Sequence, residues 1–576
     1  MGCRGRQITD HSACLAHASP ALRVSYLGSL TAGSDLDHRG TPFTEALLAD
    51  LLNALRDAVT GGIVVGRSRF NGARFSGEAD FADVTFTGRA DFDGAEFEEC
   101  SRFKRARFTE NANFKGVLFS GEASFEKAAF EKSAHFTTAV FHGEPRFSQI
   151  ECLGQADFTL VRFVSAALFD RSAFTQVSFS GARFMESADF SNTTFGRTPS
   201  LGPLVCAVSV DLEGAVFEAP VTIEIAAATV DCERTRWDAT AELRLRHADL
   251  HLRDAVLSAP TAVTTHTIPF NYLGTMLPEA AINSQNPAVH VTSVQGVDAA
   301  HLVLTDTNLA HCRFAGAFHL DQIHIEGRTT FAPVPQGIRL RGRLWPTWWS
   351  QRRTLAEEHH WRAQEVNQPA TPVPPPPGDR TWQTGPHHGN PARTPDPEDV
   401  AALYRQLRKA FEDAKNEPGA ADFYYGEMEM RRHSRSDTAR SERGLLHAYW
   451  LLSGYGLRAS RAAGWLIAAM IISVLLLMGF GLPQNSPRQG ASGNVPTGGG
   501  HVTFTIDKDD PQNPTHDRFT GKRFEKALNV TLNSVIFRSS GQDLTTAGTY
   551  IEMGSRLLEP ILLALAVLAV RGRIKR

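Results

Sequence analysis

The chain has 576 residues, of which 42% are hydrophobic and 21% charged, which excludes a wholly disordered or collagen-like protein. The formal net charge of −3 gives no general attraction to nucleic acid or acidic lipid. Seven cysteines without a C-x-x-C pair exclude a disulfide scaffold and a zinc ribbon, so we expect reduced thiols.

Residues 1–60 are expected to form an N-terminal segment with a capping helix. Residues 1–20 lack the apolar core of a secretory signal, so this segment should stay in the cytoplasm. Leucines at helical spacing after Thr44 predict a helix within residues 41–58 that covers the open end of a repeat structure.

Cys3, Cys14 and His17 form the pattern C-x10-C-x2-H and are candidate metal ligands. The spacing is atypical for a zinc site, which favours a free N-terminal segment over a bound ion. The sequence therefore predicts no metal or other cofactor, with this cluster as the point to examine.

Phenylalanine is strongly over-represented, with 36 Phe against 8 Tyr and 8 Trp. Fifteen of them recur at alternating spacings of five and six residues. They are Phe70, Phe75, Phe81, Phe86, Phe92, Phe97, Phe103, Phe108, Phe114, Phe119, Phe125, Phe130, Phe136, Phe141 and Phe147. Cys152 takes the next slot, and the series resumes from Phe158 to Phe195 with one slip at Phe179.

This ladder predicts short strands rather than a helix. An eleven-residue period also fits three helical turns, but each of the many glycines would cost about 1 kcal/mol in a helix. A small residue stands two positions before almost every Phe, and residues two apart share one face of a strand. We therefore expect a chain that bends about every five residues and forms coils, each Phe lying about 4.8 Å from a Phe of the next coil.

Several segments carry a recognisable unit, among them Ala79-Asp80-Phe81, Ala90-Asp91-Phe92 and Ala112-Asn113-Phe114. They resemble the pentapeptide-repeat family, whose unit is A(D/N)LxxAxFxx. The resemblance implies a mainly β fold, a right-handed quadrilateral β-helix with four short sides per coil. One extra residue in every second unit, as in Ser76-Gly77-Glu78, departs from the family and predicts bulged corners.

The solenoid is expected over residues 61–331, regular over 68–197 and degenerate over 205–331. Residues 260–295, rich in Pro, Thr and Asn, are interpreted as an insertion. Leu304, Leu309 and Phe314 continue the five-residue spacing close to its end.

Three segments are expected to follow the solenoid. Residues 340–366 predict an amphipathic, Trp- and Arg-rich helix that either lies on a membrane surface or caps the solenoid. Its Glu357-Glu358-His359-His360 run lacks a zinc helix's His spacing and is interpreted as solvated surface. Residues 367–398, with their many prolines, predict a linker between domains.

Residues 399–461 are predicted to be helical, with Pro418-Gly419 ending the first helix. Together with the sequence that follows, they are similar to the juxtamembrane module of membrane-bound pentapeptide-repeat proteins from actinobacteria. This module is expected to lead directly into the membrane.

Two transmembrane helices are expected. Residues 462–483 carry no charge and are long enough to cross a bilayer, and the arginines before them put their N-terminal side in the cytoplasm. The remaining predicted segments are an exterior loop at 484–526, a short apolar or re-entrant segment at 527–550, a second span at 551–570 and a basic cytoplasmic tail at 571–576. The sequence thus predicts a multi-pass protein of the cell membrane, with the solenoid and the C-terminus cytoplasmic.

This layout is loosely similar to two-span potassium-channel subunits, but RSSGQDL stands where such channels have the TVGYG filter. Within the second span, Glu552, Arg556 and Glu559 form a possible intramembrane polar site, because ionisable residues at membrane depth are functional candidates. The competing interpretation places this turn at the interface, with Glu552 and Arg556 paired.

No nucleotide-binding loop and no nucleophile elbow occurs in the sequence, so no enzyme is predicted. The favoured hypothesis is a membrane-anchored scaffold whose cytoplasmic solenoid binds a protein partner, its other partner being the lipid bilayer. The alternative is a channel-like or transport-related protein that forms homo-oligomers through its transmembrane helices, with the solenoid as regulatory domain.

A remote alternative comes from the family resemblance alone. Some pentapeptide-repeat proteins mimic DNA and bind topoisomerases. Over residues 70–195 this chain has 18 Asp and Glu against 13 Lys and Arg, only a mild acidic excess. No nucleic-acid partner is expected.

Overall fold

The computed structural model describes part of the chain: residues 3–8, 13–282, 286–335, 339–341, 345–347, 349–365, 381–384, 395–435, 438–493, 497–499, 501–536 and 541–574. It divides into two units, Met1–Lys415 and Asn416–Arg576.

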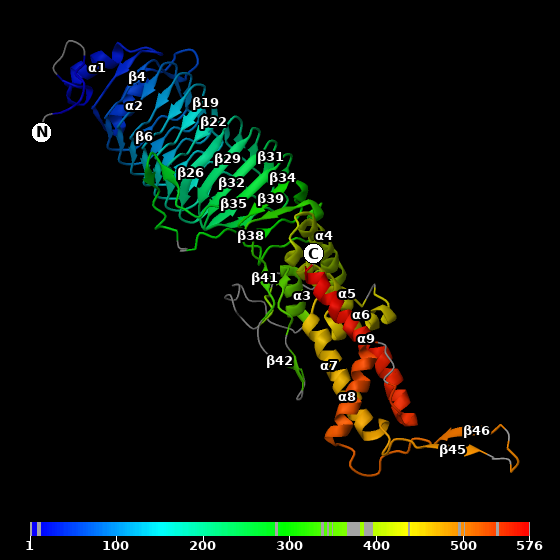
Figure 1. Ribbon diagram of the computed structural model, residues 1–576. Helices are drawn as coiled ribbons and strands as arrows, with labels where there is room; N and C mark the ends of the chain where they lie inside the picture. Colours follow the sequence, from blue (N-terminus) through cyan, green and yellow to red (C-terminus); the bar gives the residue numbers. More distant parts are fainter. Residues whose placement is uncertain are drawn as a thin grey trace. The chain divides into compact units, whose positions relative to one another are not determined.

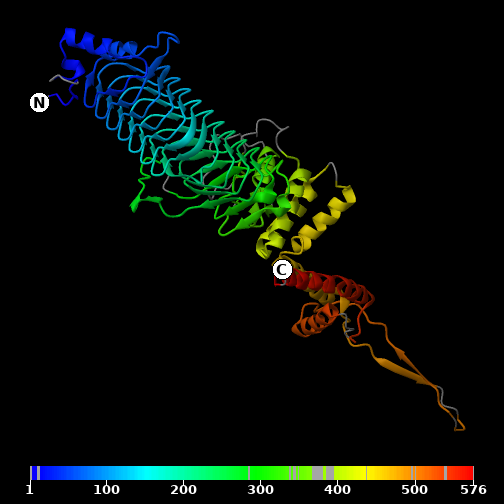
Figure 2. The ribbon, with the colours of Figure 1, turned by 90° about the horizontal axis from the view of Figure 1, so that it is seen from above.

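The first unit is dominated by a β-solenoid of about 12 turns over residues 63–326. Figures 1 and 2 show its coils stacked along one axis, from the blue end to the green end. In the described residues, parallel pairing between successive coils builds three long sheets. The periodic bending predicted from the Phe ladder is therefore confirmed.

One sheet contains β1 (Leu36–Asp37), β3 (Ile63–Val65), β4 (Ser68–Arg69), β7 (Val84–Phe86), β8 (Ala90–Asp91), β11 (Arg107–Phe108), β12 (Ala112–Asn113), β15 (Ala129–Phe130), β16 (Ala134–His135), β19 (Glu151–Asp157), β22 (Ala173–Ser178), β25 (Thr194–Phe195), β28 (Val216–Phe217), β31 (Arg236–Trp237) and β34 (Val256–Leu257). The second contains β2 (Pro42–Phe43), β5 (Arg74–Phe75), β9 (Glu96–Phe97), β13 (Leu118–Phe119), β17 (Val140–Phe141), β20 (Arg162–Phe163), β23 (Arg183–Phe184), β26 (Ser200–Cys206), β29 (Val221–Ala226), β32 (Ala241–Arg246), β35 (Thr261–Thr265), β39 (Leu302–Thr305) and β40 (His324–Glu326). The third contains β6 (Ala79–Asp80), β10 (Ser101–Arg102), β14 (Ala123–Ser124), β18 (Pro145–Arg146), β21 (Ala167–Leu168), β24 (Ala188–Asp189), β27 (Ser209–Asp211), β30 (Thr229–Asp231), β33 (Asp249–His251) and β38 (His290–Ser293).

A regular coil has four short sides, for example β7, β8, β9 and β10. Phe86 pairs with Phe108 and Phe97 with Phe119, so one coil covers four steps of the Phe ladder. At alternate corners the chain turns through a residue with positive φ, as at Asp83 (φ 61°) and Gly94 (φ 63°). The extra residue lies at the other corners, as in Ser76-Gly77-Glu78 between β5 and β6.

The phenylalanines form columns inside these coils. Phe92 stacks on Phe114 with ring centroids 5.0 Å apart and planes 2° apart, close to the predicted spacing. Rings of neighbouring columns meet edge to face, as Phe103 and Phe114 do at 5.4 Å, an arrangement that aromatic pairs favour. All fifteen predicted ladder residues lie inside the coils, fully or almost fully buried.

Later coils have three sides rather than the four expected. The coil that contains β28, β29 and β30 has a single continuous strand, β29, where regular coils have two strands and a corner. Val221 pairs with Ala241, a smaller step along the chain than the one from Phe86 to Phe108, so the coil has become shorter. The quadrilateral cross-section thus applies to the regular coils and not to these.

The N-terminal end of the stack is covered by η1 (Leu15–His17), α1 (Pro20–Gly28) and α2 (Glu45–Ala54), the blue helical segment of Figures 1 and 2. Thr44 caps α2, accepting a hydrogen bond from the Leu47 amide at 3.3 Å. The leucine face of α2 is buried, as expected for a helix that closes an open sheet edge.

The insertion is shorter than the predicted 260–295, because β35 and β38 belong to the solenoid sheets. The inserted residues lie between them and include the hairpin of β36 (Asn271–Tyr272) and β37 (Thr275–Met276).

The C-terminal end of the first unit is formed by η2 (Ala299–His301), η3 (Leu320–Gln322), β41 (Ala332–Pro333), β42 (Arg339–Arg341), β43 (Trp345–Thr347), β44 (Arg353–Thr354), α3 (Ala356–Glu365) and α4 (Pro397–Asp413). The helix predicted over 340–366 was wrong in its first half, where the chain forms β43 and β44. Glu357, Glu358 and His359 are at most 1% exposed, so their interpretation as solvated surface was also wrong.

The segment predicted as a linker between domains, 367–398, returns to the same unit. Trp382 is buried against Val334 and Ala363, and α4 packs against η3. Both ends of the segment are therefore fixed on the solenoid's C-terminal end. Residues 366–380 and 385–394 lie outside the described residues.

The second unit contains α5 (Glu417–His433), α6 (Arg440–Ser453), α7 (Ala459–Leu476), the π-helical turn η5 (Leu477–Gly481), the hairpin of β45 (Gln489–Gly493) and β46 (Phe504–Lys508), α8 (Gly521–Val535) and α9 (Thr546–Ile574). Pro418 lies in the first turn of α5 and so begins a helix, whereas the sequence analysis expected it to end one. The segment predicted as re-entrant, 527–550, holds the end of α8 and the start of α9.

Two stretches are long and apolar enough to cross a membrane: Ala459–Gly481, 23 residues, and Thr546–Arg571, 26 residues. In each, 28% of the most apolar part is buried within the protein, and the rest is half-buried or exposed. Length and composition are thus those of a span, as the sequence predicted, close to the boundaries expected at 462–483 and 551–570. The predicted tail, 571–576, begins in the last turn of α9, and residues 575 and 576 lie outside the described part.

Candidate functional site

The outer faces of the solenoid carry ion pairs between successive coils. Arg105 donates two hydrogen bonds of 2.6 Å to Asp83, and Lys104 contacts Glu126 at 2.9 Å. The Arg105 guanidinium holds the pKa of the Asp83 carboxyl below its usual range. Exposed pairs of this kind add at most about 1 kcal/mol each, but they neutralise acidic side chains within the surface itself.

The insertion is held on the solenoid by a buried ion pair. Arg246 donates hydrogen bonds of 2.7 and 2.8 Å to Glu279, and His247 contacts the same carboxylate at 3.0 Å. Burial opposes ionisation of Glu279, but the hydrogen bonds from Arg246 and His247 outweigh it and lower the pKa. Phe270 and Leu277 pack beside this pair onto the solenoid.

The tip of this insertion is apolar and exposed. Leu273 is 79% exposed and Met276 is 59% exposed, and both belong to the turn of the β36–β37 hairpin or border it. Exposed apolar side chains that lie together are candidates for a binding surface, whereas single scattered ones need no such explanation. This apolar tip was not predicted from the sequence, although Tyr-Leu-Gly-Thr-Met within a polar segment is a usable signal.

The buried residues of α3 form a polar network at the C-terminal end of the solenoid. Glu358 accepts hydrogen bonds from Arg352 at 2.6 Å, Arg362 at 2.8 Å and the Tyr404 hydroxyl at 2.6 Å. Burial opposes its ionisation, but the two guanidinium groups lower its pKa to about 2. Because α3 and α4 both contribute, the network fastens α4 to the solenoid.

The neighbouring residues of α3 have structural contacts as well. Glu357 accepts the backbone N–H groups of Phe314 at 2.5 Å and Ala315 at 2.9 Å, which ties α3 to the last coils. Burial lowers the pKa of His359 to about 3, and its Nε2 lies 2.8 Å from the Thr354 hydroxyl. These contacts describe a cap rather than a catalytic site.

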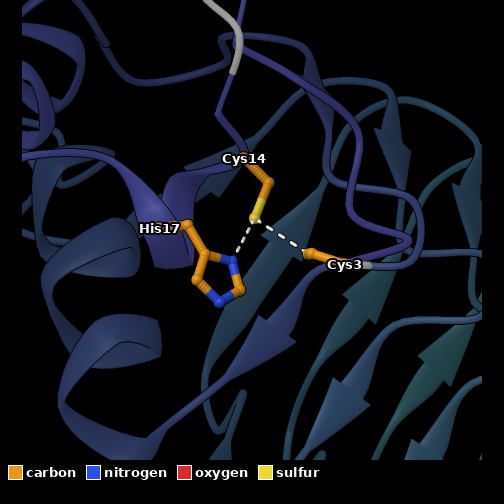
Figure 3. A group of neighbouring side chains, drawn as sticks. All are labelled: Cys3, Cys14 and His17. Atoms are coloured by element: carbon orange, nitrogen blue, oxygen red, sulfur yellow. Dashed lines mark hydrogen bonds between the residues drawn. The ribbon is translucent and has the colours of Figure 1, made fainter. Parts of the chain in front are cut away.

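Cys3, Cys14 and His17 come together at the N-terminal end (Figure 3). The Sγ atoms of Cys3 and Cys14 are 3.5 Å apart, and Cys14 Sγ lies 3.2 Å from Nδ1 of His17. Their three potential ligand atoms lie within 4.8 Å of one another. Burial raises the pKa of the Cys14 thiol. The structure thus groups the three residues, whereas the sequence analysis favoured a free segment.

The polar residues of α9 divide into two contacts. Arg556 donates a hydrogen bond of 2.7 Å to Glu552, which is the pairing that the interfacial interpretation expected. Glu559 is fully buried and accepts a hydrogen bond of 2.9 Å from Ser473 of α7. Its Oε2 has no hydrogen-bond partner among the described residues. Ser473 was missed because a serine within an apolar run carries no periodic signal.

Helix α8 packs against the end of α7 through a buried apolar cluster that includes Ala527 and Val530, and one polar side chain adds to this contact. Arg523 donates hydrogen bonds to the carbonyl groups of Met478 at 2.9 Å, Leu482 at 2.8 Å and Pro483 at 3.0 Å. Carbonyl groups at a helix end need such partners, above all in apolar surroundings. This contact fixes where the chain leaves the first apolar helix.

Comparison with known families gives one result. A family model described as pentapeptide repeats (9 copies) matches residues 70–118 and, overlapping them, residues 103–151. These residues contain most of the regular Phe columns. No curated protein and no solved structure matches the chain.

Proposed function

We propose that this protein is a membrane-anchored scaffold that presents its solenoid to a protein partner. Residues 70–151 match the model of pentapeptide repeats, and the coils continue from there into a longer solenoid. The observation that carries the proposal is the combination of an anchored apolar hairpin on the solenoid with two apolar helices of spanning length. Repeat structures of this kind offer extended surfaces for binding.

The hairpin tip is the surface that we assign to the partner. Some charged side chains on the solenoid faces pair with each other, as Arg105 does with Asp83 and Lys104 with Glu126, which reduces the charge that these faces offer for recognition. Leu273 and Met276 offer exposed apolar surface, and the buried Arg246–Glu279 pair holds their loop in place. The expected partner is a protein with a shallow apolar pocket that accepts both side chains.

The anchor is assigned to α7 and α9. Arg458 and Arg461 stand at the start of α7, and an excess of basic residues on this side favours a cytoplasmic location for the solenoid. The start of α7 and the end of α9 would then both lie on the cytoplasmic side. Paired surface charges also make a DNA mimic a poor description of this solenoid.

The test is photo-crosslinking of the full chain in native membranes, with a photoreactive residue at position 273, followed by mass spectrometry. We expect one protein to be captured, and Met276→Asp to reduce its yield at least about tenfold, because a charge would be buried in an apolar pocket. Val59→Asp is the matched control, because Val59 is 94% exposed outside the insertion. Equal yields from Met276→Asp and Val59→Asp would contradict the proposal, as would full-length chain in the soluble fraction.

The channel-like alternative is favoured by one observation, the buried Glu559 beside Ser473. A carboxyl group between two apolar helices is a candidate for carrying a proton or cation. Reconstitution in liposomes with a pH-sensitive or cation-sensitive dye tests it. Flux above that of empty liposomes, lost in Glu559→Gln and kept in Glu552→Gln, would favour transport over a purely structural anchor.

A further inference from the structure

We infer that Cys3, Cys14 and His17 bind one Zn²⁺ ion, which fastens the start of the chain to the N-terminal end of the solenoid. Two thiolates and one imidazole are a donor set that zinc prefers, and the two thiolate charges balance the charge of the ion. Reduced cysteines, as expected for a cytoplasmic segment, are available for this role.

The distances fit such an ion. With Zn–S of about 2.3 Å and Zn–N of about 2.0 Å, a tetrahedral site has S···S edges of about 3.8 Å and S···N edges of about 3.5 Å. The corresponding separations here are 3.5 Å and 3.2 Å. These two separations are within a few tenths of an ångström of the expected edges. The third pair, Cys3 and His17, lies within 4.8 Å and would close toward an edge of about 3.5 Å when the ion binds.

The backbone around the cluster is shaped for the two sulfur atoms. Gly5 donates a backbone hydrogen bond of 3.2 Å to Cys3 Sγ, the kind of contact that supports a metal-bound thiolate. A Cβ atom at position 5 would lie 2.9 Å from Cys14 Sγ and 3.2 Å from Cys3 Sγ. Only glycine lets the chain pass this close to both ligands.

The site connects the start of the chain to the segment that covers the first coil. Residues 3–8 meet the first coil through the Arg6 amide, which donates to the Arg39 carbonyl at 2.7 Å. Cys14 and His17 flank Leu15, which is fully buried. An ion held by all three ligands would close this end of the solenoid, and the exposed side of Cys3 and His17 leaves its fourth position to water.

The experiment uses the full chain in detergent, reduced and freed of metal, and titrates it with Co²⁺ and then Zn²⁺. We expect a thiolate-to-cobalt charge-transfer band that saturates at one ion per chain and is lost when zinc displaces cobalt. Cys3→Ser and Cys14→Ser should each weaken binding on the order of 100-fold, since each removes one thiolate ligand. Cys100→Ser is the matched control, because Cys100 lies outside the cluster and should leave binding unchanged.

Three outcomes would overturn the inference. One is the absence of the charge-transfer band in the unmodified chain, a reading that needs no variant to fold. Another is equal loss of binding in Cys100→Ser. The third is recovery of Cys3 and Cys14 as a disulfide when cells are lysed directly into an alkylating reagent. None of these outcomes bears on whether the hairpin binds a partner.

Discussion

The solenoid contains two kinds of coil, which differ in the number of their sides and in the side chains that fill their core. One kind extends up to Phe195, and the other lies between Val216 and Thr265. The regular coil has four strands and stacked phenylalanines, whereas the later coil is shorter and has three strands. In the later coils Ile223 and Leu243 pair at core positions where the regular coils have aromatic rings. A shorter coil encloses less space, so aliphatic side chains replace part of the aromatic core, while one column of rings continues through Phe217 and Trp237.

The difference lies in one corner. In the regular coils a residue with positive φ stands at every second corner as far as Asn192, whereas in the later coils one such corner continues, at Gly214, Arg234 and Asp254. The missing corner is the one that β29 replaces with a straight strand, Val-Thr-Ile-Glu-Ile-Ala, whose apolar residues alternate inward. Shortening the coil therefore removes a left-handed turn and joins two sides of the coil.

The largest effect is expected from emptying the regular core. Phe114→Ala removes a ring stacked between Phe92 and Phe136 at 5.0 and 4.9 Å and should lower the free energy of unfolding by about 4 kcal/mol. Leu243→Ala, in a three-sided coil, should cost about 3 kcal/mol. Urea unfolding of the full chain in detergent, followed by circular dichroism, measures both. A smaller loss at Phe114 than at Leu243 would contradict the idea that the rings carry the regular coils.

The N-terminal end of the solenoid should lose stability at low pH through His38, a buried titratable group that the purely aromatic columns lack. Burial lowers the pKa of His38 to about 4, while an unfolded histidine has a pKa of about 6.5. Between these pH values the unfolded chain binds a proton at His38 that the folded chain does not bind. The contribution of neutral His38 to the free energy of unfolding is therefore complete above pH 6.5, and about 3 kcal/mol of it is lost as the pH drops to 4.

His38→Phe tests this, because His38 already stacks on Phe70 at 6.2 Å and a phenyl ring would extend the column. The variant should lose that part of the acid sensitivity in urea unfolding at pH 7 and pH 4.5. An unchanged pH profile would show that His38 is not the group responsible.

At some corners with the extra residue the neighbouring coil approaches too closely for a side chain, and Gly143 stands at one of them. A Cβ at Gly143 would lie 2.4 Å from the carbonyl oxygen of Gly121 in the neighbouring coil. Gly143→Ala should therefore cost about 2 kcal/mol through strain in urea unfolding. Gly62→Ala is the control, because a Cβ there would meet only Thr60 Oγ1, at an ordinary contact distance of 3.6 Å. Equal losses in the two variants would mean that close approach of the coils does not matter.

How far the sequence predicts this structure depends on how local the signal is. The Phe ladder gave the regular coils because one residue type at fixed spacing reports the coil directly. The three-sided coils were not predicted, because they contain alternating Ile and Leu residues and no single residue type that recurs once per coil. Glu358 was misjudged because Tyr404, one of its partners, lies 46 residues away along the chain, a contact that no local pattern reveals. Cys3, Cys14 and His17 were found as a pattern, but only the fold brings them together.

The smallest expected effect distinguishes the two coil types most directly. A substitution by glycine should raise the free energy of unfolding in one type and lower it in the other. Lys127 stands at a left-handed corner (φ 59°), where a side chain is strained, so Lys127→Gly should raise the free energy of unfolding by about 0.5 kcal/mol. Glu224 lies within the straight strand β29, where glycine gains nothing and loses strand order, so Glu224→Gly should lower it by about 1 kcal/mol. Paired urea unfolding curves of the two variants measure the difference. Two changes of the same sign would mean that the lost corner is not what distinguishes a three-sided coil from a four-sided one.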